Sequence, residues 1–226
     1  MNVHEGENGG LTGGAETAQM QVWKGEFGRA YTDRNTLDVE EMNSLWSGNY
    51  GISRREINRI FLRGIPKDAS FLEVGCNVGN QLLQLQEDGY TNLSGIELQS
   101  YAVEIAKSRV EDVAIRQGSA LALPYKNDSF DVVFTSGVLI HIAPEDLSRA
   151  MAEIHRCAKT YIWGTEYYAP DVTSVNYRGH EELLWKMDYA RRYLESFKDL
   201  ELVREQHLPY LENQNVDTVF LLRKKR

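Results

Sequence analysis

The stretch Phe71-Leu72-Glu73-Val74-Gly75-Cys76-Asn77-Val78-Gly79-Asn80 decides the fold of this chain. Its first four residues predict a short buried strand, and residues 81–87, with three leucines, predict a helix that follows at once. Between them, Gly75 and Gly79 permit positive φ and a close approach of backbone to a ligand. Asn77 is a residue type that tolerates the left-handed region. The stretch therefore predicts a strand, a ligand-binding turn and a helix.

Strands and helices alternate around this turn. Strands are expected at 71–74, 93–98, 113–116, 130–135, 161–163, 200–203 and 218–222, and helices at 52–63, 81–87, 101–110, 144–158 and 181–197. In the helix at 52–63 the apolar residues should face inward, with Arg54, Arg55 and Arg59 outside. Repeated strand–helix units predict an α/β fold: a doubly wound, seven-stranded, mostly parallel sheet with helices on both faces. Ligands of such folds bind outside the carboxyl ends of the strands.

Length and composition indicate one soluble domain. The chain has 226 residues, 42% of them hydrophobic, and a net charge of −8, which disfavours a nucleic-acid partner. The glycine-rich residues 1–19 predict a disordered tail before a single domain at 20–226. No apolar run approaches the roughly 20 residues of a membrane span or forms a signal peptide, so a cytoplasmic protein is expected. The two cysteines suggest neither a disulfide framework nor a metal site.

Aromatic residues gather after the tail. Trp23, Phe27 and Ala30 share one face of a predicted short helix. This segment is interpreted either as a helical lid over the ligand site or as ordinary core packing.

The turn at residues 73–80 binds a nucleotide-like ligand in the favoured interpretation. A dinucleotide site needs glycines in the pattern G-x-G-x-x-G, and here Asn77 and Asn80 occupy two of the three positions. The pattern acid-x-Gly-x-x-x-Gly, which suits S-adenosylmethionine (SAM), is met by Glu73, Gly75 and Gly79. A tight structural turn without a ligand is the alternative.

Three further loops follow strands and favour the ligand interpretation. Glu97 ends the second strand, where a carboxylate can accept hydrogen bonds from both hydroxyls of a ribose. Ser119 and Ala120 follow the third strand, where the adenine edge would lie. Residues 131–141 lead the fourth strand into the site and end at His141.

These stretches resemble the class I SAM-dependent methyltransferases over roughly residues 55–165. Trp23-Lys24-Gly25-Glu26-Phe27-Gly28, residues 136–142, Glu166-Tyr167-Tyr168 and Tyr177-Arg178-Gly179-His180 are similar to the methylases associated with pseudaminic acid biosynthesis. The resemblance implies SAM as cofactor and a sugar-like acceptor. Ser119 stands where many relatives carry an aspartate, so adenine recognition there is expected from the backbone. The implied cofactor-binding residues are Trp23, Glu73, Gly75, Cys76, Asn77, Gly79, Asn80, Glu97, Leu98, Ser119, Ala120, Ser136 and Gly137.

The acceptor region is predicted from charge and aromatic residues. An alcohol acceptor needs a general base, and His141 and His180 are the candidates; the alternatives for His141 are a cap of the helix at 144–158 or a hydrogen bond to backbone. Tyr31, Arg34, Tyr168, Tyr177, Arg178 and Lys186 are the candidate acceptor-binding residues. A guanidinium matches a carboxylate or phosphate, so Arg178 favours an anionic acceptor, whereas a surface ion pair is the plain alternative.

The hypothesis is therefore a SAM-dependent methyltransferase that acts on a small polar, anionic metabolite such as a sugar or nucleotide-linked sugar, on O or N. It is expected to work as a monomer or homodimer without a nucleic-acid or membrane partner. The alternatives are a SAM-binding protein without transferase activity and an NAD-dependent oxidoreductase.

Overall fold

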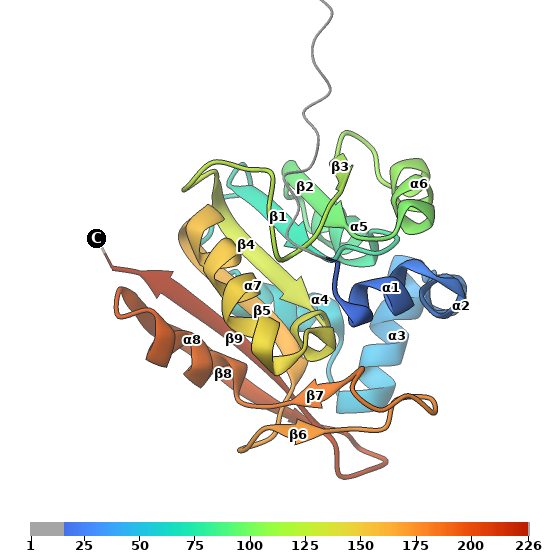
Figure 1. Cartoon of the computed structure of the whole chain (residues 1–226). Helices are drawn as coiled ribbons and strands as arrows, with labels where there is room; N and C mark the ends of the chain where they lie inside the picture. The colour runs from blue at the N-terminus through green and yellow to red at the C-terminus, as the bar shows by residue number, and fades with distance from the viewer. Residues whose placement is uncertain (1–15, 226) are drawn as a thin grey trace, which may run out of the picture.

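A central sheet organises the computed structural model, which describes residues 16–225 (Figure 1). Its strands are β1 (Ser70–Val74), β2 (Asn92–Glu97), β3 (Ala114–Gln117), β4 (Phe130–Ser136), β5 (Ala158–Tyr167), β8 (Leu200–Pro209) and β9 (Val216–Lys224). They lie in the order β3-β2-β1-β4-β5-β9-β8. Neighbours from β3 to β5 pair in parallel, whereas β9 is antiparallel to both β5 and β8. The predicted seven-stranded, mostly parallel α/β fold is confirmed.

Helices cover both faces of this sheet. They are α3 (Val39–Tyr50), α4 (Arg54–Phe61), α5 (Asn80–Glu87), α6 (Ser100–Arg109), α7 (Pro144–Cys157) and α8 (Tyr189–Ser196), with a 3₁₀ turn, η1, at Leu139–His141. Apolar side chains of α7 and α8 pack with Val133, Ile162 and Phe220 on one face. Those of α3 to α6 pack with Phe71 and Phe134 on the other. None of these helices, nor any other in residues 16–225, is long and apolar enough to cross a membrane.

Two short helices precede the sheet and lie between α3 and α6 in Figure 1. They are α1 (Ala18–Lys24) and α2 (Glu26–Arg34), separated at Gly25. The hydroxyl of Thr17 accepts a hydrogen bond from the backbone N–H of Met20 and so caps α1. The helix predicted around Trp23 is thus two helices. Ordered structure reaches into the last residues of the predicted tail, and residues 1–15 of that tail lie outside the described part.

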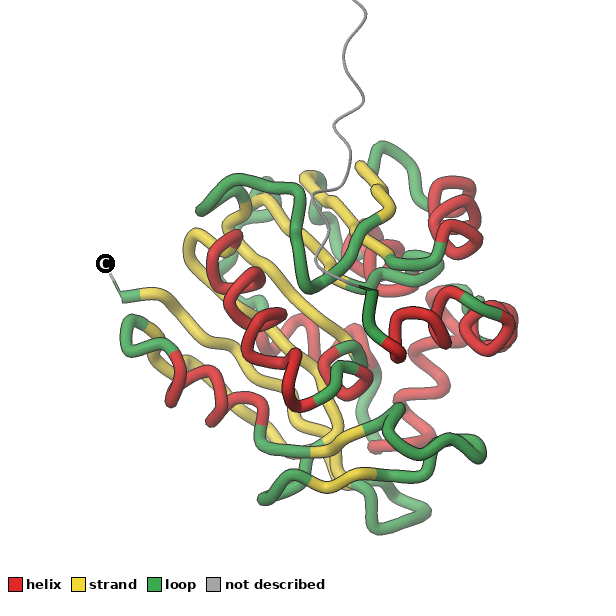
Figure 2. Tube along the Cα trace, in the orientation of Figure 1, coloured by secondary structure: helices red, strands yellow, loops and turns green. Residues whose placement is uncertain are grey.

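The predicted helix at 181–197 is wrong in its first half. Residues 181–188 are not helical; Trp185–Lys186 form β7, which pairs antiparallel with β6 (Thr173–Ser174). Figure 2 shows this part of the chain mostly as loop, with the helix starting only at α8. Glu182 has a φ of +60°, a left-handed conformation that no α-helix contains. A helical i, i+4 pair of Glu182 with Lys186 is therefore ruled out.

The predicted outward position of Arg54 in the helix at 52–63 is wrong. The expected outward face holds for Arg59, which is exposed, but the side chain of Arg54 is fully buried. Its guanidinium lies over the rings of Trp46 and Trp163 and donates to Asn58 Oδ1 and Thr165 Oγ1. Flat aromatic faces and hydrogen bonds replace the water that the charge loses.

Candidate functional site

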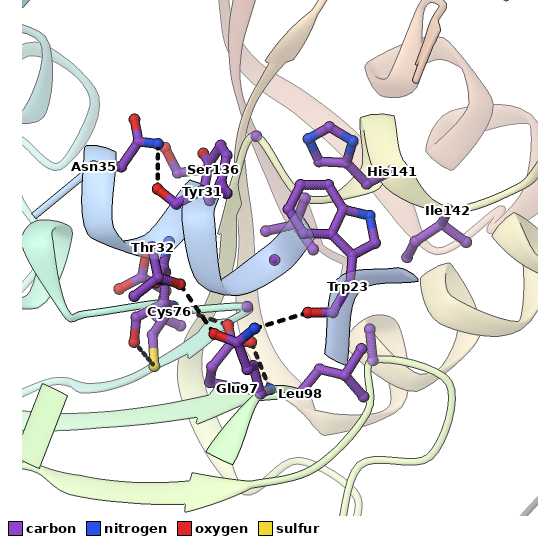
Figure 3. Close-up of a pocket in the computed structure, with 18 of the residues that line it drawn as sticks. Trp23, Tyr31, Thr32, Asn35, Cys76, Glu97, Leu98, Ser136, His141 and Ile142 are labelled. Carbon is purple, nitrogen blue, oxygen red and sulfur yellow. Dashed lines mark hydrogen bonds between the residues drawn. The ribbon is translucent and has the colours of Figure 1, made fainter. Parts of the chain in front are cut away.

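A cavity of about 330 Å³ lies at the carboxyl ends of β1, β2 and β4 (Figure 3). Nearly all predicted cofactor-binding residues line it: Trp23, Glu73, Gly75, Cys76, Asn77, Asn80, Glu97, Leu98, Ser119, Ala120, Ser136 and Gly137. Helices α1 and α2 form one wall through Met20, Trp23, Tyr31 and Thr32. We call this space the first cavity.

The glycine turn has the predicted backbone. Gly75, Asn77 and Gly79 have φ values of +74°, +44° and +79°. A side chain at residue 75 would place its Cβ 2.6 Å from a methyl carbon of Val138, so only glycine fits without movement. Gly79 does not line the cavity; it precedes α5 as the N-cap and packs against Val110. It shapes the turn from behind.

Glu97 is half-buried in the wall of the first cavity. Its carboxylate accepts hydrogen bonds from the backbone N–H groups of Asn77 and Gln99, both at 2.9 Å. Burial raises its pKa, and the backbone N–H bonds oppose that rise. Each carboxylate oxygen has a further lone pair, so Glu97 joins two loops and still has acceptor capacity toward the cavity.

Glu73 places a second carboxylate on this cavity. Its side chain is 3% exposed and its Oε2 atom has no hydrogen-bond partner among the described residues. Burial raises its pKa well above the usual range, and the buried Arg54 works in the opposite direction. A buried acceptor atom without a partner is costly and commonly marks the place of a water or ligand donor.

Helix α2 is tied to the turn by side chains that the sequence analysis did not select. The hydroxyl of Thr32 lies 3.0 Å from Asn77 Oδ1 and 3.1 Å from Gln99 Oε1. The Gln99 amide donates to the carbonyl of Trp23, and Asn80 donates to the carbonyl of Asn35. For Thr32 and Gln99 the sequence offered one signal of a role in the site, the position of Gln99 two residues after Glu97.

A second cavity of about 250 Å³ adjoins the first. Tyr31, Leu45, Trp46, Ser136, Gly137 and His141 line both. The remaining wall comes from residues distant in sequence: Asn49, Tyr50, Ile140, Thr165, Tyr167, Tyr177, Leu184, Tyr210 and Asp217. Only Tyr31, His141 and Tyr177 were predicted to meet an acceptor.

Asp217, on β9, carries the charge of the second cavity. Its side chain is 5% exposed, and Oδ2 accepts a 2.6 Å hydrogen bond from the Tyr50 hydroxyl. The other oxygen, Oδ1, has no partner among the described residues. Burial raises the pKa of this carboxyl to about 7, against the hydrogen bonds from Tyr50 and Tyr210.

His141 lies where the two cavities meet. Its ring is 4.4 Å from the ring of Trp23 and 5.5 Å from that of Tyr177, centre to centre (Figure 3). Nδ1 is 2.7 Å from the carbonyl oxygen of Leu183. A carbonyl only accepts, so Nδ1 carries the hydrogen and Nε2 keeps a lone pair. Burial lowers the pKa of His141 to about 4, so the ring is neutral.

The loop that carries His141 is held by another buried carboxyl group, that of Glu166. Glu166, 1% exposed, accepts hydrogen bonds from the backbone N–H groups of Val138 and Ile140. Its carboxylate therefore fixes the loop that carries Ser136, Gly137 and His141 into the site.

The other predicted acceptor residues line neither cavity. Arg34, Arg178 and His180 are exposed, and His180 contacts the edge of Phe27 at 5.0 Å between ring centres. Tyr168 stacks on His207. Lys186 lines neither cavity; it donates a hydrogen bond to Asn215 and lies 5.5 Å from the centre of the Tyr167 ring.

Comparison with known proteins finds a methyltransferase domain in part of the chain. Residues 72–161 match a family model described as a methyltransferase domain. A zebrafish EEF1A lysine methyltransferase 2 is 24% identical over 197 residues, which cover 84% of this chain and 78% of that protein. A Haemophilus influenzae protein is 28% identical over 102 residues, but this chain spans only 41% of its length.

A solved structure supports the same conclusion on the fold. The 1,6-didemethyltoxoflavin-N1-methyltransferase of Burkholderia thailandensis, crystallised with its substrate and S-adenosylhomocysteine, is 15% identical with a TM-score of 0.64. The match covers 89% of this chain and 90% of that one. The domain match and the shared fold make this chain similar to SAM-dependent methyltransferases.

Proposed function

We propose that this chain is a class I SAM-dependent methyltransferase, which transfers the methyl group of SAM from the first cavity to a hydroxyl or amine of a small polar metabolite in the second. The observation that carries the proposal is the shared wall, in which Tyr31, Ser136 and His141 border both spaces. Methyl transfer is an in-line displacement that needs the two reactants about 3–3.5 Å apart and water excluded. Adjoining cavities at the end of β4 meet that need.

The first cavity suits the groups of SAM. The Glu97 carboxylate is placed to accept the ribose hydroxyls, and Ser119 and Ala120 border the space for the adenine. At Gly75 the backbone can approach a ligand more closely than any side chain would allow. The unpartnered oxygen of Glu73 suits the ammonium group of the methionine part. Bound SAM supplies an electrophilic methyl group on sulfur.

The second cavity sets the acceptor. Its volume of about 250 Å³ is below the range of about 300–1,000 Å³ that is typical of drug-sized ligands. A single small ring, such as a free sugar, or the reacting end of a larger molecule is therefore the supported size. The predicted anion clamp is not part of this proposal, because Arg178 and His180 are exposed and line neither cavity.

A screen of small acceptors tests the proposal. The protein is incubated with SAM and each acceptor, and mass spectrometry detects a product heavier by one CH₂ together with S-adenosylhomocysteine. Loss of the ring in Tyr177→Ala, which lines the second cavity, should lower transfer without changing SAM affinity. The matched variant Tyr168→Ala removes a tyrosine that lies outside both cavities and should leave transfer intact. Equal effects of the two changes would remove the second cavity from the reaction.

A further inference from the structure

We propose that the second cavity takes an amine, held by the Asp217 carboxylate among aromatic faces, so that the methyl group goes to nitrogen. This inference rests on the proposed function, because it assumes that the second cavity is the acceptor site. Among the described residues that line this cavity, Asp217 has the only carboxylate and none is lysine or arginine. The charge of the wall therefore favours a cation.

The carboxylate is incompletely satisfied. Tyr50 and Tyr210 both point their hydroxyls at Oδ2 of Asp217, at 2.6 and 3.5 Å, whereas Oδ1 has no partner among the described residues. Burying an acceptor atom in this way is unfavourable unless a donor completes it. An ammonium group brings three donors and a positive charge, which complete both the hydrogen bond and the charge of Asp217.

Aromatic rings form a large part of the remaining wall. Tyr50 meets Trp46 at 4.9 Å and Tyr210 at 4.7 Å between ring centres, and Tyr167 meets Tyr210 edge-on at 6.4 Å. Tyr31 and Tyr177 continue the wall toward His141. Ring faces carry negative potential and attract ammonium groups, the more so where water is excluded. No lysine or arginine among the described lining residues would balance the charge of a carboxylate or phosphate.

Two cations lie near Asp217 outside the cavity lining. Arg54 is confined between two tryptophan rings, and Lys186 is held by Asn215 at 2.5 Å. Both favour the ionised form of Asp217, as do the hydrogen bonds from Tyr50 and Tyr210, and burial opposes them all. The groups that face this carboxyl are thus those of α3, α4, β7 and the β8–β9 connection. They oppose the burial that raises the pKa of Asp217 to about 7.

His141 also favours nitrogen as the acceptor atom. A neutral imidazole whose pKa burial lowers to about 4 is poorly matched to remove a proton from an alcohol. Its free Nε2 lone pair can accept a hydrogen bond from an amine N–H and so aim the nitrogen. A neutral amine attacks a methyl group without any base in the transition state.

A proton transfer precedes the methyl transfer. The bound ammonium gives one proton to the Asp217 carboxylate, which frees the nitrogen lone pair. This pair forms the new C–N bond with the methyl carbon while the C–S bond breaks, and the sulfur keeps the bonding electrons. The products are the N-methylated ammonium and S-adenosylhomocysteine, and the proton on Asp217 returns to solvent.

Three probes that share one carbon skeleton and differ in charge test this inference. Ethanolamine, ethylene glycol and glycolate are titrated into the protein saturated with S-adenosylhomocysteine, and saturation-transfer NMR measures binding. Chemical shifts of ¹³C-labelled tyrosine rings locate each probe. We expect ethanolamine to bind about tenfold more tightly than the other two, the fold-change given by one hydrogen bond to a charged group.

Asp217→Asn supplies the second arm. Asparagine has the same shape and still accepts from Tyr50, so S-adenosylhomocysteine affinity should hold while the preference for ethanolamine disappears. The matched control Asp171→Asn changes an exposed aspartate that lines neither cavity and should keep the preference. If Asp217→Asn does not fold, the ranking of the three probes on the unaltered protein decides alone.

The outcomes separate the two proposals. Binding of glycol or glycolate at the labelled tyrosines as tightly as ethanolamine overturns the amine inference and leaves the acceptor site standing. Binding of none of the probes there, with S-adenosylhomocysteine bound normally, overturns both. A preference for ethanolamine that persists in Asp217→Asn also overturns the inference, since the carboxylate would then play no part.

Discussion

The two cavities are built in different ways. The first takes most of its wall from loops that each follow one strand, such as the turn at Gly75 and the loop at Glu97. The second takes its wall from α2, α3, the end of β4 with η1, β5, the β6–β7 region and the β8–β9 hairpin, and its one carboxylate among the described residues comes from β9. Local sequence patterns therefore specify the space for the cofactor, whereas long-range packing specifies the space for the acceptor.

The largest effect is expected where α2 crosses the cofactor turn. A Cβ at Gly28 would lie 1.8 Å from the carbonyl oxygen of Trp23, and 2.8 Å from the Gln99 amide nitrogen. Gly28→Ala should therefore separate α1 from α2, lower the free energy of unfolding by about 3 kcal/mol and weaken SAM binding. Thermal unfolding and calorimetric titration with SAM measure the two effects.

The matched control for this change is Gly48→Ala in α3. A Cβ there meets nothing within 4 Å, so alanine should stabilise that helix by about 0.5–1 kcal/mol relative to glycine. If both variants have the same free energy of unfolding and the same SAM affinity, the close contact at Gly28 is not needed for stability and the first cavity does not depend on α2.

The next effect concerns the local part of the first cavity. Glu97→Ala should weaken SAM binding about 10- to 150-fold, because hydrogen bonds to a charged group contribute about 1.5–3 kcal/mol. The exposed Glu104, on α6 and paired with Lys107, provides the control Glu104→Ala. Unchanged SAM affinity in Glu97→Ala would break the assignment of the ribose to this carboxylate.

A smaller effect is expected at Asp217, whose burial in the second cavity lowers the free energy of unfolding at high pH. The pKa of Asp217 is raised from 3.8 to about 7 in the folded protein, so the folded state holds its proton more tightly than the unfolded chain. Its favourable contribution is present below about pH 4 and is lost as the pH rises through 7. Asp217→Asn should therefore raise the free energy of unfolding by about 1–2 kcal/mol at pH 8 and change it little at pH 4.

Denaturant unfolding at the two pH values measures this difference. Asp171→Asn, on an exposed loop, should show no such pH-dependent gain. A variant at Asp217 that is less stable than the unaltered protein at pH 8 would contradict the picture of a strained, ligand-ready carboxylate.

The smallest effect is expected at Arg178. The side chain is exposed and lines neither cavity, so Arg178→Lys should change transfer and stability by less than about 0.5 kcal/mol, as for other surface substitutions. The hypothesis of an anion clamp at this position requires a strong loss of activity instead. Initial rates below acceptor saturation distinguish the two, and a strong loss would return the acceptor site to the loop at 177–180.

The same contrast explains what the sequence could predict. The turn at residues 75–79 was predictable because backbone conformation near glycine and asparagine is a local property, and the order of the strands then assembled the first cavity. The helix expected from residue 181 was not, because the spacing of Leu183, Met187 and Ala190 fits a buried helical face equally well. Pairing of β6 with β7, a contact across the loop, decides the actual structure.

Buried charges were the least predictable feature. An amphipathic pattern puts Arg54 in water, yet two tryptophan faces and a threonine from other elements make its burial favourable. Asp217 likewise reads as the polar start of a strand. Only its hydrogen bonds with Tyr50 and Tyr210, which come from distant segments, identify Asp217 as part of a cavity. No residue neighbouring either one in the sequence carries that information.

The antiparallel hairpin of β8 and β9 has a consequence for how this enzyme can diverge. It sits at the end of the sheet away from β1 and β2, and its amino acids can be exchanged without touching the glycine turn. Tyr210, in the connection between the two strands, and Asp217, near the start of β9, line the second cavity, and Asn215 between them accepts a hydrogen bond from Lys186. Substitutions in residues 210–217 can therefore change the second cavity and leave the lining of the first one unaltered.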